Sequence, residues 1–124
     1  MVRMSGESII SFTLSVPPSV NAMYRRNPHS YGLYKTNEAK AWINESLIRM
    51  RLQRVPKRHF KNGVDLTFNF YFNRDRDIDS GEKALLDLLE EYGLVENDKY
   101  VRSKFTTKDK DKKNPRVEVE VVDN

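Results

Sequence analysis

The sequence contains no cysteine, few glycines and no long apolar segment. The lack of cysteine excludes disulfides, thiolate zinc sites and thiol nucleophiles. No run approaches the roughly 20 apolar residues that a membrane-spanning helix needs, and the beginning of the chain lacks the apolar stretch of about 7–15 residues of a signal peptide. A glycine-rich phosphate-binding loop is also absent. We therefore expect a cytoplasmic protein that uses neither a membrane nor a nucleoside triphosphate.

The composition is that of one small domain with a thin core. With 124 residues the chain is long enough for a single hydrophobic core and too short for two independent ones. It is 38% hydrophobic and 32% charged, a balance that favours self-association. We expect one domain over residues 1–124, with flexible ends at residues 1–7 and 122–124.

Charge is distributed unevenly along the chain. Residues 75–98 contain nine Asp or Glu against two bases, a balance of −7, while the whole chain is +4. Residues 1–62 carry eleven bases against three acids, a balance of +8, and residues 99–116 carry eight against two, a balance of +6. Both basic flanks favour binding to a polyanion, and the carboxylates between them would repel it unless a divalent cation neutralised them.

Hydrophobic periodicity predicts the first part of the fold. The alternation from Ile10 to Val16 and from Val64 to Phe72 is typical of half-buried strands. Between them, Thr36 can cap a helix that runs to about Gln53. Its buried stripe recurs at intervals of four and three residues and comprises Ala39, Ile43, Leu47 and Met50.

The second half predicts another helix and a hairpin. Asp79 and Glu82 have the spacing of a capping box, and Gly93 is a C-terminal stop. Beyond it we expect a strand with Val101 and Phe105 inward, a lysine-rich turn at residues 108–115, and a last strand with inward valines at Val117, Val119 and Val121. The pattern corresponds to an α+β domain with a four-stranded mixed sheet and two helices.

Asp77 and Asp79 lie at the junction of a strand and a helix. An extended backbone there would put both side chains on one side. Paired carboxylates form a hard-oxygen site that suits magnesium or manganese. Asp98 follows nineteen residues after Asp79 and can join them only if the chain folds back. The alternative is that Asp79 is only a helix cap and that the other charges are solvated.

Two further interpretations concern the same segment. Asp75, Asp77 and Asp79 resemble the start of an EF-hand calcium loop, but Ser80 then stands where glycine is required and Leu86 where a bidentate glutamate belongs. Lys83 lies four residues before Asp87, so it can be half of a surface ion pair or can face a phosphate.

These residues resemble a known family. The run from Asp77 to Asp87, with Lys83 within it and Asp98 downstream, resembles the RusA family of Holliday junction resolvases, whose signature is Asp-x-Asp-Asn-x-x-Lys-x-x-x-Asp with a later Asp-Asp pair. Further matches lie just after the first strand, at Pro17, Pro18, Ser19, Asn21 and Tyr24. Two positions depart from the pattern, because Ser80 replaces the usual asparagine and Asn97 replaces the first aspartate of the pair.

The resemblance implies a small homodimeric, magnesium-dependent endonuclease, with manganese as a possible substitute, that cuts four-way DNA junctions by paired symmetric nicks. It implies a role in recombination and repair, and such proteins often come from prophages. By matching positions, Asp77, Asp79 and Asp98 are the metal-binding residues and Lys83 is the basic catalytic residue; the role of Asp87 stays open.

DNA contacts are expected from the basic segments. The candidates are Asn21, Tyr24, Arg25, Arg26, Arg76, Arg102, Lys104 and Lys108. The bases on the strand after Asp98 alternate with other residues, so we expect them to form a positive stripe along one side of the sheet. Two other functions remain open: a weak or inactive DNA-binding module of the same fold, and a structural or regulatory partner protein.

Overall fold

The computed structural model describes residues 2–4, 8–26, 33–57, 60 and 63–123. For Val2–Met4, Ser8, Val20, Asn21, Arg26, Leu33, Tyr34 and Asp98 it describes the backbone alone. The strands are β1 (Val2–Met4), β2 (Ser8–Leu14), β3 (Tyr24–Arg26), β4 (Leu33–Lys35), β5 (Val64–Phe72), β6 (Val101–Lys110) and β7 (Arg116–Asp123). The helices are α1 (Val20–Met23), α2 (Asn37–Leu52) and α3 (Glu82–Tyr92), with a 3₁₀ turn, η1 (Asp98–Tyr100).

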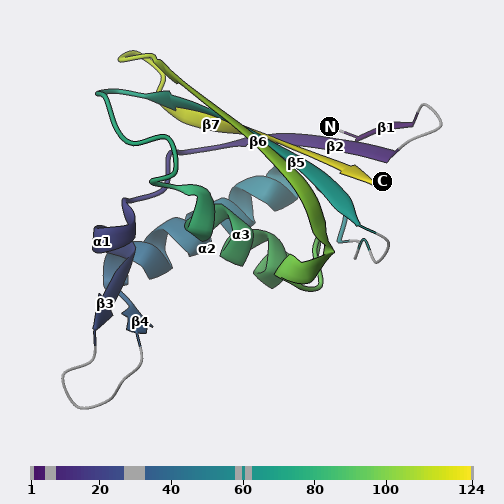
Figure 1. Ribbon diagram of the computed structural model, residues 1–124, viewed down its shortest axis with the longest axis horizontal. Helices are drawn as coiled ribbons and strands as arrows, with labels where there is room; N and C mark the ends of the chain where they lie inside the picture. Colours follow the sequence, from purple (N-terminus) through teal and green to yellow (C-terminus); the bar gives the residue numbers. More distant parts are fainter. Residues whose placement is uncertain (1, 5–7, 27–32, 58–59, 61–62, 124) are drawn as a thin grey trace.

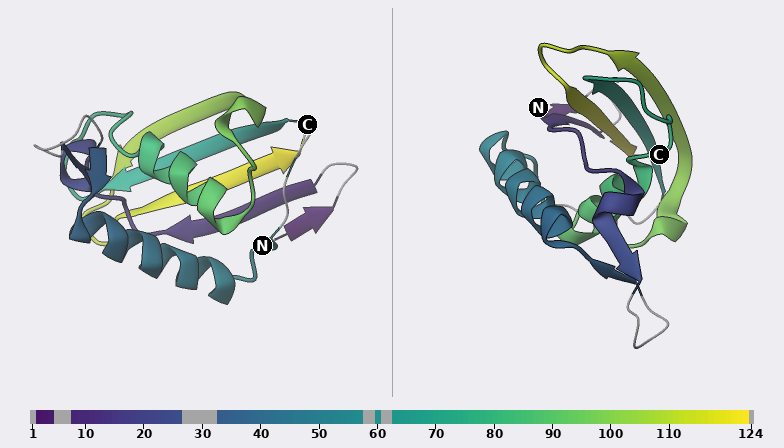
Figure 2. Two further views of the ribbon diagram at one scale, coloured as in Figure 1. Left: turned by 90° about the horizontal axis from the view of Figure 1, so that it is seen from below. Right: turned by 90° about the vertical axis from the view of Figure 1, so that its left-hand side faces the viewer.

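The main sheet is mixed and has the strand order β1-β2-β7-β5-β6. Among the described strands of this sheet, β5 and β6 pair in parallel and the other neighbours pair antiparallel. Helices α2 and α3 lie on one face of this sheet and leave the other face open (Figures 1 and 2). The predicted α+β domain with a four-stranded mixed sheet and two helices is confirmed, and the short strand β1 extends the sheet at its edge.

Strand β5 is the centre of the core. Its burial alternates along all nine residues, as the sequence period of two predicts. On the helix side, the ring of Phe70 stacks on Phe72 at 5.2 Å and meets the edge of Phe68 at 6.4 Å. Aromatic pairs at these separations add to the burial of apolar surface. These three aromatic rings therefore belong to the core on the helix side of the sheet.

The first long helix is as predicted. The Thr36 hydroxyl accepts the Ala39 N–H at 3.1 Å and donates to the Ala22 carbonyl at 2.6 Å, so it caps α2 and ties it to α1. Of the predicted stripe, Ala39, Ile43 and Met50 are buried and Leu47 is half-buried.

The second long helix has the predicted core face and C-terminal end. Its buried residues include Leu85, Leu88, Leu89 and Tyr92. Gly93 has φ 99°, a left-handed conformation that glycine adopts without strain, and its N–H returns to the Leu89 carbonyl at 3.2 Å.

The predicted hairpin at the C-terminal end is wrong. Strands β6 and β7 do not pair, because β5 lies between them. Helix α3 carries the chain back along the sheet, so β6 runs parallel to β5. Phe105 aligns with Thr67 on the open face and is 65% exposed instead of pointing inward. Val101 packs partly against the core, and the three valines of β7 are buried as predicted.

The segment after the two prolines is more structured than the predicted loop. It contains α1 and β3, and β3 pairs with β4 in a small antiparallel sheet. This two-stranded sheet lies apart from the main sheet, beyond the start of α2 (Figure 1). Tyr24 and Arg25, two of the candidate DNA-binding residues, belong to β3.

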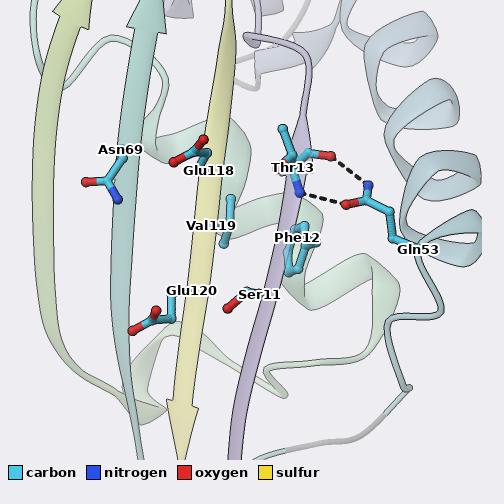
Figure 3. Close-up of a pocket in the computed structure, with 8 residues that line it drawn as sticks. All are labelled: Ser11, Phe12, Thr13, Gln53, Asn69, Glu118, Val119 and Glu120. Atoms are coloured by element: carbon cyan, nitrogen blue, oxygen red, sulfur yellow. Dashed lines mark hydrogen bonds between the residues drawn. The ribbon is translucent and has the colours of Figure 1, made fainter. Parts of the chain in front are cut away.

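The residue that ends α2 also contacts an edge of the main sheet. Strand β1 covers β2 only as far as Ile10, so no strand among the described residues pairs with Thr13 on this edge. The Gln53 amide accepts the Thr13 N–H at 2.9 Å and donates to the Thr13 carbonyl at 2.7 Å (Figure 3). One side chain thus satisfies both backbone groups. No helix within the described residues is long and apolar enough to cross a membrane.

Candidate functional site

The predicted metal-binding pair lies in the loop between β5 and α3. The Asp77 carbonyl accepts the Ser80 N–H at 3.1 Å, and the Asp79 carbonyl accepts the Glu82 N–H at 3.3 Å. These bonds form a turn, so the extended backbone that we predicted between the two aspartates is wrong. Both side chains are exposed, and within the described part of the chain neither carboxylate has a hydrogen-bond or ion-pair partner.

Helix α3 begins later than the capping box predicted. Its first residue is Glu82, Gly81 occupies the N-cap, and no side chain in the described part of the chain caps the helix. The Glu82 carboxylate instead accepts the Thr106 hydroxyl at 2.6 Å and lies 3.6 Å from the Lys104 ammonium. The Asp79 side chain is therefore not used as a cap and is available for other chemistry.

Close packing explains why glycine precedes the helix. A Cβ atom on Gly81 would lie 2.8 Å from Cγ of Pro17 and 2.9 Å from Cε1 of Phe70. Such distances are shorter than van der Waals contact, so only glycine lets the loop lie this close to the core. The packing fixes the C-terminal end of the loop between β5 and α3, residues 73–81, which we call the acidic loop.

Lys108 fixes the other end of the loop. Its ammonium donates to Asp75 Oδ1 and to the Arg76 carbonyl, both at 2.9 Å. The hydrogen bond from Lys108 and its positive charge lower the pKa of Asp75. A residue predicted to bind DNA thus holds the loop that contains Asp77 and Asp79.

Arg76 is turned toward the protein. Its guanidinium donates to the Pro17 carbonyl at 3.1 Å and lies 4.7 Å from the centre of the Phe72 ring. Burial, with the nearby Arg74, lowers the pKa of Arg76. The Nη2 atom is buried and has no partner within the described residues. The contacts of Arg76 are those of a loop anchor.

Lys83 lies in the first turn of α3 and makes two contacts. Its ammonium is 3.6 Å from Asp87 Oδ2 and 4.8 Å from the centre of the Tyr24 ring. The Tyr24 hydroxyl donates a short hydrogen bond to the same Asp87 oxygen. Burial raises the pKa of the half-buried Tyr24 phenol, and the Asp87 carboxylate raises it further, so Tyr24 remains a donor.

The third predicted ligand lies at the far end of α3. The backbone of Asp98 begins η1, beyond the C-terminal end of the helix, whereas Asp77 and Asp79 precede its N-terminal end. The helix has 11 residues, or about 16 Å of rise. The side chain of Asp98 lies outside the described part, and the described residues include no group of three acids or histidines that could hold a metal ion.

The predicted basic stripe is formed in part. Lys104 and Lys108 align with Leu66 and Phe70, so both lie on the helix side of the sheet, next to α3 and the acidic loop. Arg102 falls at the register shift near the start of β6 and packs over Gly63. Arg25 is exposed on β3, and the side chains of Asn21 and Arg26 lie outside the described part.

The open face of the sheet carries carboxylates from β7. A shallow pocket of about 350 Å³ lies there, over the polar side chains of the central strands (Figure 3). Its ionisable residues are Glu118 and Glu120, both from β7. A polyanion would be repelled from these carboxylates.

Two features could not have been found in the sequence. The bond between Tyr24 and Asp87 joins residues 63 positions apart, and the packing of Gly81 on Pro17 joins the same two regions. The only local signal was the spacing of four between Lys83 and Asp87, which predicts a pair on one helix face.

The chain thus folds into an α+β domain with paired carboxylates before a helix, a lysine in the first turn of that helix and bases around them. The sequence model of the family described as Endodeoxyribonuclease RusA matches residues 15–122, and the chain belongs to this family. The family comprises nucleases that act on Holliday junctions. No curated protein sequence matched the chain.

Proposed function

We propose that this protein is a magnesium-dependent endonuclease that resolves four-way DNA junctions by paired symmetric nicks. Asp77, Asp79 and Asp98 are the metal-binding residues and Lys83 is the catalytic cation. One observation supports this assignment most strongly: two exposed carboxylates without partners among the described residues lie in a loop that Lys108 and Gly81 fix at both ends.

The donor set suits a hard divalent cation. Carboxylate oxygens are the ligands that Mg²⁺ and Mn²⁺ take in proteins, and Mg²⁺ keeps several waters, so few protein ligands suffice. Asp77 and Asp79 are exposed. Within the described part of the chain their carboxylates make no hydrogen bonds, so none has to break before they bind an ion. The chemistry that Mg²⁺ supplies when bound is an acidified water and a counter-charge for the phosphate.

The residues around the pair have separate roles. Lys83 supplies positive charge where the transition state of phosphodiester hydrolysis accumulates negative charge. Lys104 and Arg25 are exposed bases that can bind phosphates of the junction arms. Lys108 and Arg76 hold the acidic loop, which fixes the direction of the carboxylates before DNA binds.

A homodimer would bring the third aspartate to the pair. Within one chain, α3 separates Asp98 from Asp77 and Asp79. A second copy that packs its η1 turn against the acidic loop would supply an aspartate there, and the twofold symmetry would create two such sites. Two symmetric sites also agree with two symmetric nicks, because each site cuts one strand.

The test is cleavage of labelled four-way, three-way and linear duplex DNA, with and without Mg²⁺ or Mn²⁺, on a denaturing gel. The wild-type protein should nick only the four-way form, symmetrically and only with metal, and its binding should weaken steeply with salt. Asp79→Asn should lose cleavage by on the order of 10²-fold or more and keep binding, while Glu91→Gln, an exposed acid at the end of α3, serves as the control.

Binding without nicks at any concentration of either metal would overturn the proposed enzyme and identify a DNA-binding module of the same fold. Full cleavage by Asp79→Asn would refute the site. A lack of salt-dependent DNA binding would leave only a structural or regulatory role.

A further inference from the structure

Three side chains from two distant segments meet beside the first turn of α3. The Tyr24 hydroxyl donates to Asp87 Oδ2, the Lys83 ammonium lies 3.6 Å from the same oxygen, and this ammonium lies over the Tyr24 ring at 4.8 Å. Each member contacts both others. The cluster is closed, which distinguishes it from a simple pair on a helix surface.

We propose that Tyr24 and Asp87 are positioning residues that hold the ammonium group of Lys83 in place for catalysis. Tyr24 fixes the carboxylate of Asp87, Asp87 fixes the ammonium, and the Tyr24 ring covers one side of it. This inference rests on the proposed function, in which Lys83 is the catalytic cation.

An ion pair alone would not hold this lysine. Exposed ion pairs four residues apart on a helix are weak, and the Lys83 side chain is 52% exposed. A lysine side chain loses much rotamer freedom when it is fixed, so one such contact leaves it mobile. The face of the Tyr24 ring supplies a second attraction for the same ammonium. The two contacts together restrict the side chain more than either does alone.

The hydroxyl of Tyr24 has a role of its own. Asp87 is 27% exposed, and without a donor its carboxylate could rotate toward water. The phenol occupies the same oxygen that faces Lys83, so it fixes the orientation of the carboxylate. Burial and Asp87 raise the pKa of Tyr24, and the phenol therefore keeps its proton throughout the neutral range.

The same contact connects the small sheet to α3. Tyr24 is the first residue of β3 and Arg25 is the second, and Arg25 is an exposed candidate for DNA binding. The neighbour of Arg25 on β3 is Tyr24, whose ring contacts Lys83. Phosphate binding at Arg25 would therefore act on the strand that contacts the lysine. The cluster thus links DNA recognition by β3 to the catalytic lysine.

The test is a set of mutant cycles. Tyr24→Phe removes the hydroxyl and keeps the ring, Asp87→Asn removes the charge at constant size, and Lys83→Met removes the cation. Each of the first two should lower the single-turnover nicking rate by on the order of 10-fold at saturating protein, with junction binding unchanged. In the Lys83→Met background, neither should lower the rate further, because residues that act through Lys83 are not additive with it.

A second measurement needs neither metal nor DNA. The NMR order parameter of the Lys83 Cε–Hε group, from ¹³C relaxation of the free protein, should fall in Tyr24→Phe and in Asp87→Asn. Lys40, an exposed lysine on α2, serves as the control and should not change. Asp87→Glu keeps the charge and should recover part of the rate. Thermal melts of all variants identify any that fail to fold. If Tyr24→Phe or Asp87→Asn fails to fold, the other of these two variants tests the positioning role.

The outcomes separate the two proposals. Additive losses in the Lys83→Met background, or an unchanged order parameter at Lys83, would overturn the positioning role even if the wild-type protein cuts junctions. If the wild-type protein does not cut them, the proposed function fails. A drop in the order parameter would then still show that Tyr24 and Asp87 hold the lysine.

Discussion

The hydroxyl of Tyr24 donates a hydrogen bond to the carboxylate of Asp87, and this bond joins β3 to the middle of α3. Two further contacts connect the segment after β2 to the acidic loop: Pro17 packs on Gly81, and the Pro17 carbonyl accepts a hydrogen bond from the Arg76 guanidinium. The loop that carries Asp77 and Asp79 is therefore bordered by parts of the chain about 60 residues away in sequence.

The first prediction concerns the subunits of the proposed dimer. Asp79→Asn and Asp98→Asn should each be inactive alone, and a mixture of the two should recover nicking at one strand. If Asp98 completes the site of a second copy, a mixed dimer contains one site with both substitutions and one with neither. The measurement is cleavage of four-way junctions after co-refolding of the two variants.

The control is a chain that carries both substitutions, mixed with either single variant. No combination with the double variant yields an intact site, so these mixtures should stay inactive. A mixture of the single variants that also stays inactive would show that Asp98 acts within its own chain or not at all.

The second prediction separates the loop anchor from ordinary surface charge. Lys108→Ala removes the bonds to Asp75 and to the Arg76 carbonyl, so the acidic loop should become less well ordered. The single-turnover rate at saturating protein should fall by on the order of 10-fold. Lys112→Ala, an exposed lysine of the β6–β7 connection, should weaken binding slightly and leave this rate unchanged. Equal rates for the two variants would contradict the anchoring role of Lys108.

The third prediction tests the packing beneath the loop. Gly81→Ala should destabilise the protein by about 1–3 kcal/mol, because the added methyl group would collide with Pro17 and Phe70. Ser80→Ala is the matched control. The Ser80 hydroxyl is buried without a partner in the described part, so its removal should be neutral or stabilising. The urea midpoint of unfolding, at constant m-value, measures the stability of both variants. Equal midpoints for Gly81→Ala and Ser80→Ala would be inconsistent with the packing of Gly81 on Pro17 and Phe70.

The fourth prediction concerns pH and the connection between β6 and β7. Backbone N–H groups, chiefly that of Asn114, and the Arg116 guanidinium donate to Asp111 and lower its pKa. A lowered pKa in the folded state means that the ionised carboxylate stabilises the fold at neutral pH. This contribution disappears as the pH falls through that lowered pKa.

Asp111→Ala should therefore lower the urea midpoint at pH 7, and the difference from wild type should shrink on acidification below about pH 4. Glu91→Ala, at an exposed acid with no partner among the described residues, should show no such dependence. If the difference in urea midpoint between Asp111→Ala and wild type stays constant with pH, the charge of Asp111 does not contribute to stability.

Local patterns in the sequence predicted the individual elements well. The bounds of β5 and α2 agree with the expected ranges, because alternation, a capping threonine and an apolar stripe are properties of neighbouring residues. The family was also evident, because the spacing of Asp77, Asp79 and Lys83 is local, and the family match confirmed it.

Long-range relationships were not available in the same way. A lysine-rich turn between two strands is typical of a hairpin, and nothing local indicates that β5 inserts between β6 and β7. The start of α3 was also misplaced, because Gly81, which packs closely on Pro17, occupies the N-cap in place of Asp79. The metal-binding roles of Asp77, Asp79 and Asp98 stay predictions.

The amide of Gln53 has a consequence for the behaviour of the protein in solution. An uncovered strand edge is a template on which another chain can add a strand, and such addition leads to aggregation. Gln53 already occupies the backbone groups of Thr13 that an incoming strand would need. The residue that ends α2 thus also protects the sheet from unwanted growth along β2, and Gln53→Ala should make the protein more prone to form fibrils at high concentration.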